Sequence, residues 1–165
     1  MEHPFLRVYM EHVRLPDGRV IEDWPIVGAR DYVMVVARNP TGEMLILEGY
    51  KHGLGRSSWQ VVGGYIEVGE EPLQTAKREL LEEAVYASDD WAHLGTFVVD
   101  ANRRASWAHI FLARNARPAT KPESDDLERT ELKWVPVQEA ASALSDGRVG
   151  IISSAVAIAL ALPLP

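Results

Sequence analysis

The sequence predicts an α+β fold in which helices pack on a mixed sheet. Three observations support this prediction: strand-like segments fill the first third, one amphipathic helix follows, and helices close the chain. The 165 residues suit one domain with a substantial core. The apolar fraction of 47% and the charged fraction of 25% are ordinary for such a domain, and they argue against a disordered or fibrous protein.

The first element is a hairpin. Residues 6–15 alternate loosely between polar and apolar side chains, Pro16-Asp17-Gly18 forms a turn, and residues 20–24 return as the partner strand. The one natural boundary lies near Gly28. We therefore divide the chain into an N-terminal hairpin region, residues 1–28, and a main domain, residues 29–165.

The main domain combines strands, one loop-rich stretch and helices. Four glycines mark residues 53–64 as loop-rich, and a polar, acidic surface loop is expected between Pro118 and Glu131. Pro72 suits the first turn of a helix along which apolar residues recur at spacings of three and four: Leu73, Ala76, Leu80 and Ala84. Strands are expected at residues 32–37, 44–50, 94–99, 108–113 and 132–135, and further helices at 137–144 and 149–162.

The charge and residue content exclude several classes of function. With a formal net charge of −7, the surface does not attract nucleic acid, and a polyanionic substrate would need cations between itself and the protein. The lack of cysteine excludes a disulfide framework, a thiolate zinc site and a cysteine nucleophile, and it is compatible with the cytoplasm. No secretory signal is visible. The apolar run from Val149 to Pro165 is interrupted by serines and prolines, so we expect a core helix rather than a membrane anchor.

Three glutamates on the central helix are the candidate chemical group. Glu79, Glu82 and Glu83 follow Glu70, and their spacings of three and four place them on one helix face. Like charges so placed repel each other by a few tenths of a kcal/mol per pair, so stability does not explain them. A bound hard divalent cation would explain this arrangement, because magnesium prefers oxygen ligands. A solvated acidic face is the alternative.

The stretch around these glutamates closely resembles the Nudix box. That family's pattern is Gly, five residues, Glu, seven residues, Arg-Glu, an aliphatic residue, any residue, Glu-Glu, any residue, Gly and an aliphatic residue. Seven positions match: Gly64, Glu70, Arg78, Glu79, Leu80, Glu82 and Glu83. Two depart from it. Val85 stands where the family has the glycine that usually ends the helix, and Tyr86 stands where it has an aliphatic residue.

The resemblance implies a Nudix-type α/β/α sandwich that binds magnesium, with manganese as the alternative. It also implies hydrolysis of the pyrophosphate bond of a nucleoside diphosphate linked to another group. The implied metal ligands are three side chains and one backbone carbonyl: Glu79 and Glu83 as the main ligands, Glu82 sharing, and Gly63. Glu70 and Arg78 would form a supporting ion pair. The cations would neutralise the pyrophosphate and lower the pKa of a bound water.

A broader resemblance is to the ADP-ribose and ADP-sugar pyrophosphatases. Tyr50-Lys51-His52-Gly53 and Trp59–Gly64 resemble the Tyr-Arg-His and Leu-Pro-Gly-Gly run of that group, and the hairpin, residues 108–113 and the closing segment from Trp134 are also similar. The likeness implies a small-molecule substrate such as ADP-ribose, cleaved to AMP and a sugar phosphate, and a homodimer to which the hairpin contributes. Val62 replaces the proline of that run, and residues 100–106 lack a proline-containing pattern, so the reaction is better defined than the substrate.

Further site residues are expected outside the box. The attacking water needs a base, for which the resemblance indicates a carboxylate near the C-terminus: Glu128 first, then Asp126 and Glu131. Trp24 is a candidate for stacking on a nucleobase across a dimer interface, and Arg56 and Arg104 are candidates for holding phosphates. Each could instead be a packing or solvated side chain.

Two rival functions stay open. One is a Nudix hydrolase of another nucleotide, such as a nucleoside triphosphate or a different NDP-sugar. The other is a Nudix-fold protein that binds a nucleotide or a partner without turnover, against which the intact glutamates argue.

Overall fold

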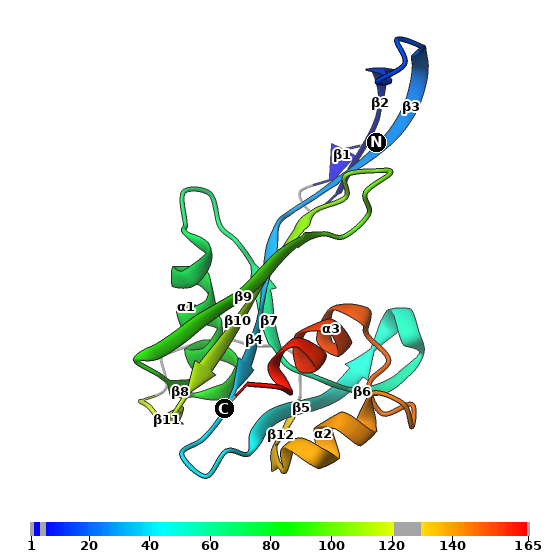
Figure 1. Ribbon diagram of the computed structural model, residues 1–165. Helices are drawn as coiled ribbons and strands as arrows, with labels where there is room; N and C mark the ends of the chain where they lie inside the picture. The colour runs from blue at the N-terminus through cyan, green and yellow to red at the C-terminus, as the bar shows by residue number, and fades with distance from the viewer. Residues whose placement is uncertain (1, 4–5, 121–129, 165) are drawn as a thin grey trace.

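The computed structural model describes residues 2–3, 6–120 and 130–164 of the chain. The N-terminal part forms a three-stranded antiparallel sheet of β1 (Glu2–His3), β2 (Leu6–Arg14) and β3 (Val20–Ala29). The β2–β3 hairpin turns at Gly18, whose φ of 88° favours glycine. It projects from the rest of the molecule as an arm (Figure 1).

The central sheet has four strands in the order β7-β4-β10-β9. Their bounds are Val62–Tyr65, Tyr32–Ala37, Trp107–Arg114 and Asp90–Val98 respectively. β10 runs parallel to β4, whereas the β4–β7 and β9–β10 pairs are antiparallel, so the sheet is mixed as predicted. β7 lies at one edge of this sheet, and its outer side is therefore available to other parts of the chain.

A second sheet has the order β12-β5-β6, with bounds Glu131–Val135, Met44–Lys51 and Arg56–Gln60. A 3₁₀ turn, η1 (His52–Leu54), connects β5 to β6. A short ladder joins β8 (Tyr86–Ala87) to β11 (Arg117–Pro118). β5 is buried on both faces, so it packs into both halves of the core.

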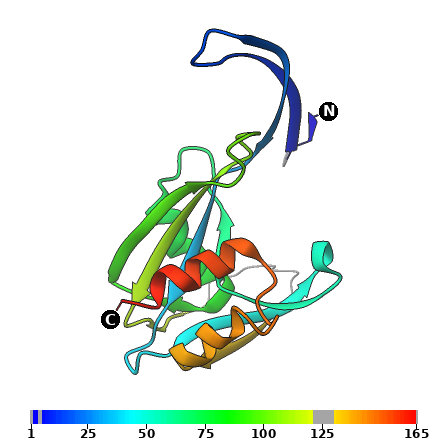
Figure 2. The same ribbon diagram turned by 45° about the vertical axis from the view of Figure 1, so that its right-hand side comes forward.

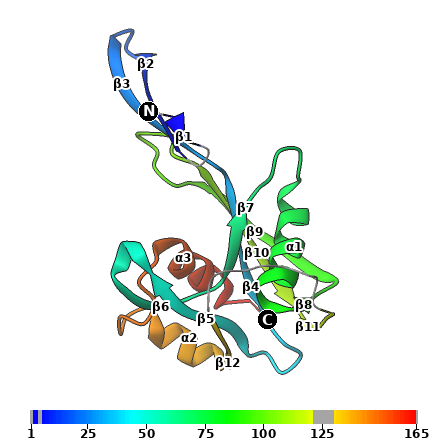
Figure 3. The ribbon, with the colours of Figure 1, turned by 180° about the vertical axis from the view of Figure 1, so that it is seen from behind.

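Helices cover both faces of the central sheet, which gives the α/β/α sandwich. α1 (Pro72–Ala84) packs on one face, where Leu80 contacts a cluster that includes Val33 and Val35. α3 (Ile152–Ala161) packs on the other face with α2 (Val137–Ala143), against Met34 and Ile110. Figures 2 and 3 show α3 and α1 on opposite sides of the strands. The alternation of β4 side chains between the two clusters follows from the two-residue period of a strand.

α1 begins and ends where the motif places it. Pro72 occupies the first turn, where its missing N–H costs nothing. Val85 ends the helix in the left-handed conformation, with φ 60° and ψ 37°, and its N–H is directed to the carbonyls of Leu80 and Leu81. The position therefore keeps the conformation that glycine would adopt freely, at a cost of about 1–2 kcal/mol for a side chain with a Cβ.

Two expectations from the sequence are wrong. Residues 53–64 were expected to be loop-rich, but they contain β6 and β7, because hydrogen bonding to β5 and β4 outweighs the glycine content. The last helix begins at Ile152 rather than at Val149. The N–H groups of Val149 and Gly150 bond instead to Ala143 O and Ser58 Oγ, so these residues belong to a loop.

Arg38 fastens the end of α3 to the central sheet. It follows β4 and is 7% exposed. Its two terminal nitrogens donate to backbone carbonyls, Nη1 to Leu164 O at 2.6 Å and Nη2 to Ala161 O at 2.8 Å. These carbonyls lie at and beyond the helix end, where they have no partner within the helix.

A helix needs about 20 predominantly apolar residues to span a bilayer. Within the described residues, no helix is both long and apolar enough to cross a membrane.

Candidate active site

The glutamates of α1 lie against the edge strand β7, and two glycines make this approach possible. A Cβ on Gly64 would overlap the carboxylate of Glu79. A Cβ on Gly63 would lie 2.8 Å from Met34 Sδ and 2.9 Å from Val33 O. A larger residue at position 64 would therefore displace the Glu79 carboxylate, and one at position 63 would crowd the backbone of β4 at Val33 O.

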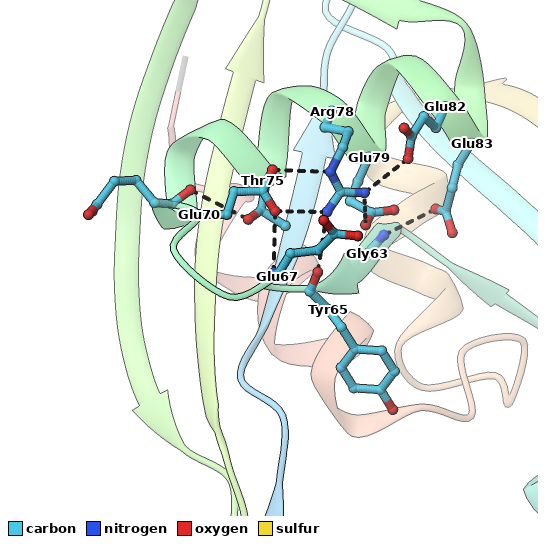
Figure 4. Close-up of polar contacts among 10 residues, drawn as sticks. Gly63, Tyr65, Glu67, Glu70, Thr75, Arg78, Glu79, Glu82 and Glu83 are labelled. Carbon is cyan, nitrogen blue, oxygen red and sulfur yellow. Dashed lines mark hydrogen bonds and ion pairs between the residues drawn. The ribbon is translucent and has the colours of Figure 1, made fainter. Parts of the chain in front are cut away.

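Glu70 and Arg78 form a two-pronged ion pair that ties the loop before α1 to the helix (Figure 4). Arg78 Nε lies 3.1 Å from Glu70 Oε1, and Nη2 lies 3.0 Å from Oε2. Nη2 also donates to Tyr65 O at 3.3 Å, which joins the end of β7 to the same group. Paired N–H donors on a planar carboxylate are the strong form of such a contact, and they fix the geometry of the loop.

Arg78 also contacts two glutamates of its own helix. Its Nη1 donates to Glu79 Oε1 at 2.7 Å and to Glu82 Oε2 at 2.9 Å. One guanidinium therefore serves three carboxylates, with one edge directed to Glu70 and the remaining nitrogen to the helix (Figure 4). This shared positive charge offsets the repulsion expected between Glu79 and Glu82.

Glu83 reaches across to the edge strand. Its Oε2 accepts a hydrogen bond from Gly63 N at 3.2 Å. The N–H and C=O of one strand residue point to the same side, so the Gly63 carbonyl also faces the outer side of β7. Glu83 and Gly63 are thus neighbours at one place on the sheet edge, with oxygen atoms from both.

Burial and charge shift the pKa values of these groups in opposite directions. Desolvation by burial raises the pKa of Glu79, a shift that the hydrogen bond from Arg78 partly offsets. The Arg78 guanidinium lowers the pKa of Glu70 to about 2, with further help from Thr75 and the Glu67 N–H. The pKa of Arg78 is itself raised, chiefly by its bond to Glu70. Burial thus disfavours the charged form of Glu79, and an added positive charge would favour it.

The low pKa of Glu70 predicts how acid affects stability. Because the folded pKa of about 2 lies below the ordinary value of 4.5, ionised Glu70 stabilises the fold above pH 4.5. This contribution is lost as the pH falls from 4.5 towards 2. We expect Glu70→Gln to be less stable than the wild type near neutral pH and to lose less stability on acidification.

Urea denaturation at about pH 7 and about pH 3 measures this difference. Glu71→Gln is the matched control, because Glu71 precedes α1 without capping it through its side chain. Equal losses of unfolding free energy in the wild type and Glu70→Gln would contradict the prediction.

The oxygen donors fit a divalent cation in kind, although Glu79 and Glu82 are paired with Arg78 while Glu83 is bonded separately to Gly63 N. Within the described ranges, no three acidic or histidine side chains stand close enough together to hold a metal ion directly. Arg78 holds Glu79 and Glu82, and Gly63 N–H holds Glu83. A carboxylate set with one carbonyl is the chemistry that magnesium or manganese prefers. Release of these contacts would be needed for Glu79, Glu82 and Glu83 to converge.

A cavity of about 450 Å³ adjoins these donors. Gly63, Gly64 and Glu83 line one side of it, and the start of α3 lines another. Lys51, the cationic residue at the end of β5, also lines this cavity. The site therefore combines acidic oxygens, a cation and a space of the size that holds a small ligand.

The other predicted side chains lie elsewhere. Arg56 donates to Ser57 O at 3.0 Å and lines a separate cavity with Trp59 and Arg148. Glu131 is exposed on β12, with its carboxylate 3.4 Å from Lys133 Nζ. Glu128 and Asp126 fall outside the described residues, so the base stays a prediction.

Trp24 and Arg104 take part in contacts that connect the hairpin arm to the loop between β9 and β10. Trp24 Nε1 donates to Asn102 O at 2.6 Å, and Arg104 forms an ion pair with Glu11 at 2.5 Å. Val27 N and Ala29 N of β3 also donate hydrogen bonds to backbone carbonyls of the loop between β9 and β10. Within one chain, the described contacts thus connect Trp24 and Arg104 to the arm rather than to the glutamates.

Sequence reasoning gave no role to three residues of the cavity wall: Lys51, Tyr32 and Ser153. Lys51 belongs to the Tyr50–Gly53 segment that resembles the ADP-sugar pyrophosphatases, so this resemblance could have indicated a role for it. Tyr32 and Ser153 are 121 positions apart in the numbering, so no local pattern connects them.

Comparisons with known proteins agree with this arrangement. The NUDIX domain model matches residues 28–152. The chain is 31% identical to a CMP-5'-(N-acetyl-N-hydroxy-3-aminopropyl)phosphonate hydrolase of Streptomyces rubellomurinus, over 94% of this chain and 74% of the relative. It is 29% identical to ADP-ribose pyrophosphatases of Mycobacterium tuberculosis and Bacillus subtilis, over 92% of this chain and 73% and 82% of those proteins.

A solved structure shares the fold. The crystal structure of an ADP compounds hydrolase superposes with a TM-score of 0.80 at 20% identity, over 97% of this chain and 86% of the other. This likeness confirms the predicted fold class. The sequence matches add the family, because the domain model covers most of the chain. The chain therefore belongs to the Nudix family of pyrophosphohydrolases.

Proposed function

We propose that this protein hydrolyses the pyrophosphate bond of a nucleoside diphosphate linked to another group, with magnesium as cofactor and ADP-ribose or another ADP-sugar as substrate. The arrangement of Glu79, Glu82 and Glu83 beside Gly63, at the mouth of a cavity, carries the proposal. Relatives that are ADP-ribose pyrophosphatases support the choice of substrate. The expected products are AMP and a sugar phosphate.

The proposed roles are those that the resemblance to the Nudix box implies for these positions. Glu79 and Glu83 would be the main metal ligands, with Glu82 and the Gly63 carbonyl sharing. Glu70 and Arg78 would position the loop and the helix relative to each other. A bound divalent cation would neutralise phosphate oxygens and lower the pKa of a water molecule. The base is proposed to be Glu128, and a cytoplasmic location stays a prediction.

A second candidate substrate has its own support. The relative from Streptomyces rubellomurinus is named for a CMP-linked phosphonate, and it covers nearly the whole of this chain. Cytidine compounds in which CMP is joined to a phosphonate or a phosphate contain the same kind of anhydride linkage, in which one oxygen bridges two phosphorus atoms. The metal arrangement suits either substrate, so the distinction rests on the groups around the cavity.

The experiment is a panel of linked nucleotides incubated with the protein and magnesium, with products separated by chromatography. ADP-ribose, ADP-glucose, CMP-linked compounds and nucleoside triphosphates form the panel. Release of AMP from ADP-ribose in the presence of magnesium, abolished by a chelator, is the expected result. Faster release of CMP would favour the second candidate. No turnover of any compound would indicate a binding protein and contradict the proposal.

We further propose that the protein is a homodimer to which the hairpin arm contributes. Leu6, Val8 and Met10 lie on one face of β2 and are 37%, 43% and 63% exposed. A row of exposed apolar side chains on a projecting arm is the kind of surface that a second protein surface covers. Light scattering should give twice the chain mass of 18.4 kDa. A monomer mass at micromolar concentration would contradict this proposal.

A further inference from the structure

The cavity beside the glutamates has a second wall, formed by β4, β6 and the start of α3. Tyr32 lies at the beginning of β4, Gln60 at the end of β6, and Ser153 in the first turn of α3, and all three line the cavity. Tyr32 packs with the cluster on the α3 side of the sheet. This wall is formed by the face of the sheet opposite α1.

The polar groups of this wall form a small set with spare hydrogen-bonding capacity. Tyr32 and Ser153 each contribute a side chain with a hydroxyl group to the lining of this cavity. The Gln60 side chain makes no hydrogen bond with any described residue, although it is half-buried in the cavity wall. By contrast, Ser154 Oγ is fully buried and accepts a bond from Val61 N. Ser154 therefore has a structural partner, whereas Gln60 has none within the described chain.

Neutral hydroxyl and amide groups match the chemistry of a sugar. Each hydroxyl can donate one hydrogen bond and accept two, and an amide offers two donors and an acceptor. A group with several hydroxyls can pair with all three side chains at once. A phosphate would be better matched by cations, and a nucleobase would be bound mainly by stacking on aromatic rings.

We propose that three side chains of this wall determine specificity: Tyr32, Ser153 and Gln60. They would bind the polyhydroxylated group of the substrate, which leaves with one of the two phosphates after cleavage. The proposal rests on the proposed function, since it assigns one end of the substrate to this wall. The bond to be cleaved would then lie beside Glu83 and Gly63, and the sugar would extend towards α3. These residues hold the substrate but take no part in the chemical step.

The first test uses D-ribose 5-phosphate as the probe and measures binding by calorimetry in the presence of magnesium. Tyr32→Phe and Ser153→Ala each remove one hydroxyl and keep the shape of the side chain. We expect each to weaken binding of ribose 5-phosphate about five- to tenfold, as the loss of one hydrogen bond implies. Binding of AMP should change less than about twofold. Ser142→Ala on α2, whose hydroxyl bonds within its own helix to Gln138 O, is the matched control.

The second test separates a binding role from a general structural one. With ADP-ribose, the variants should raise KM while kcat stays within about twofold. With ADP that carries a methyl ester on its terminal phosphate, which has no sugar beyond the pyrophosphate, KM should be unchanged. Thermal unfolding of the variants should match the Ser142→Ala control.

Three results would overturn the proposal. Ribose 5-phosphate that does not bind the wild type at millimolar concentration, or binds the variants equally well, would remove the subsite. Weakened AMP binding in the variants would assign the wall to the nucleoside instead. Equal effects on ADP-ribose and the methyl ester would indicate a structural role. If ADP-ribose is not cleaved at all, the proposed function fails, but the binding of ribose 5-phosphate still decides the role of this wall.

Discussion

Replacing Glu83 by glutamine is expected to lower kcat/KM for the pyrophosphate substrate by roughly a thousandfold, equivalent to about 4 kcal/mol of transition-state stabilisation. The glutamine keeps the size of the side chain and an oxygen that can accept the Gly63 N–H bond seen in the structure. It removes the negative charge that a divalent cation would require. Activity should therefore fall while the fold is retained.

Initial rates over a range of magnesium concentrations measure this effect. The magnesium concentration for half-maximal rate should rise in Glu83→Gln, and isothermal titration should show weaker magnesium binding without substrate. Glu71→Gln is the matched control, because it changes the same residue type next to the same helix but outside the site. Full turnover in Glu83→Gln would refute the assignment of the metal ligands.

Arg38→Ala is expected to lower the free energy of unfolding by about 3–4 kcal/mol, through the loss of two charge-assisted hydrogen bonds in a buried place. Its guanidinium donates to Leu164 O and Ala161 O, and Nε is buried without a hydrogen-bond partner among the described residues. Removal would leave both carbonyls without this donor and open a cavity under the end of α3. The melting temperature should fall by roughly 10 °C.

Thermal and urea unfolding of the variant measure this loss. Arg38→Lys should be intermediate, because an ammonium group can reach one carbonyl but cannot bridge two. Arg19→Ala is the control, since Arg19 pairs with Asp17 on an exposed turn where an ion pair adds little. An Arg38→Ala protein as stable as Arg19→Ala would show that α3 is held by its apolar contacts alone.

The sequence predicted the parts of the site that depend on fixed spacing along the chain. The bond between Glu70 and Arg78 spans eight positions and was expected from the resemblance to the Nudix box. The sharing of Arg78 Nη1 between Glu79 and Glu82 could not be predicted, because it depends on side-chain rotamers. The glycines near position 63 suggested a loop, but they lie in strand β7. Their lack of a side chain allows α1, β7 and β4 to approach one another closely.

Long-range partners account for the other differences. Arg104 stays a candidate for holding a phosphate, and its contact with Glu11, 93 positions away on the hairpin, could not be predicted. Tyr32 and Ser153 come to line one cavity only when α3 packs on the central sheet. Such contacts are set by tertiary packing, and neither periodicity nor a local motif reports on them. The fold class was more accessible, because it depends on the order of the elements.

The Arg78 guanidinium is shared between Glu70 in the loop and two glutamates of α1, and this sharing affects how the glutamates could bind a cation. Its Nη1 already balances Glu79 and Glu82, while the edge towards Glu70 is committed to the loop. Uptake of a divalent cation would then be an exchange of counter-ions, in which one positive charge leaves the carboxylates as another arrives. Glu79 and Glu82 can therefore stand one turn apart on a folded helix before any metal is present, and the contact of Arg78 with Glu70 would keep the loop in place during the exchange.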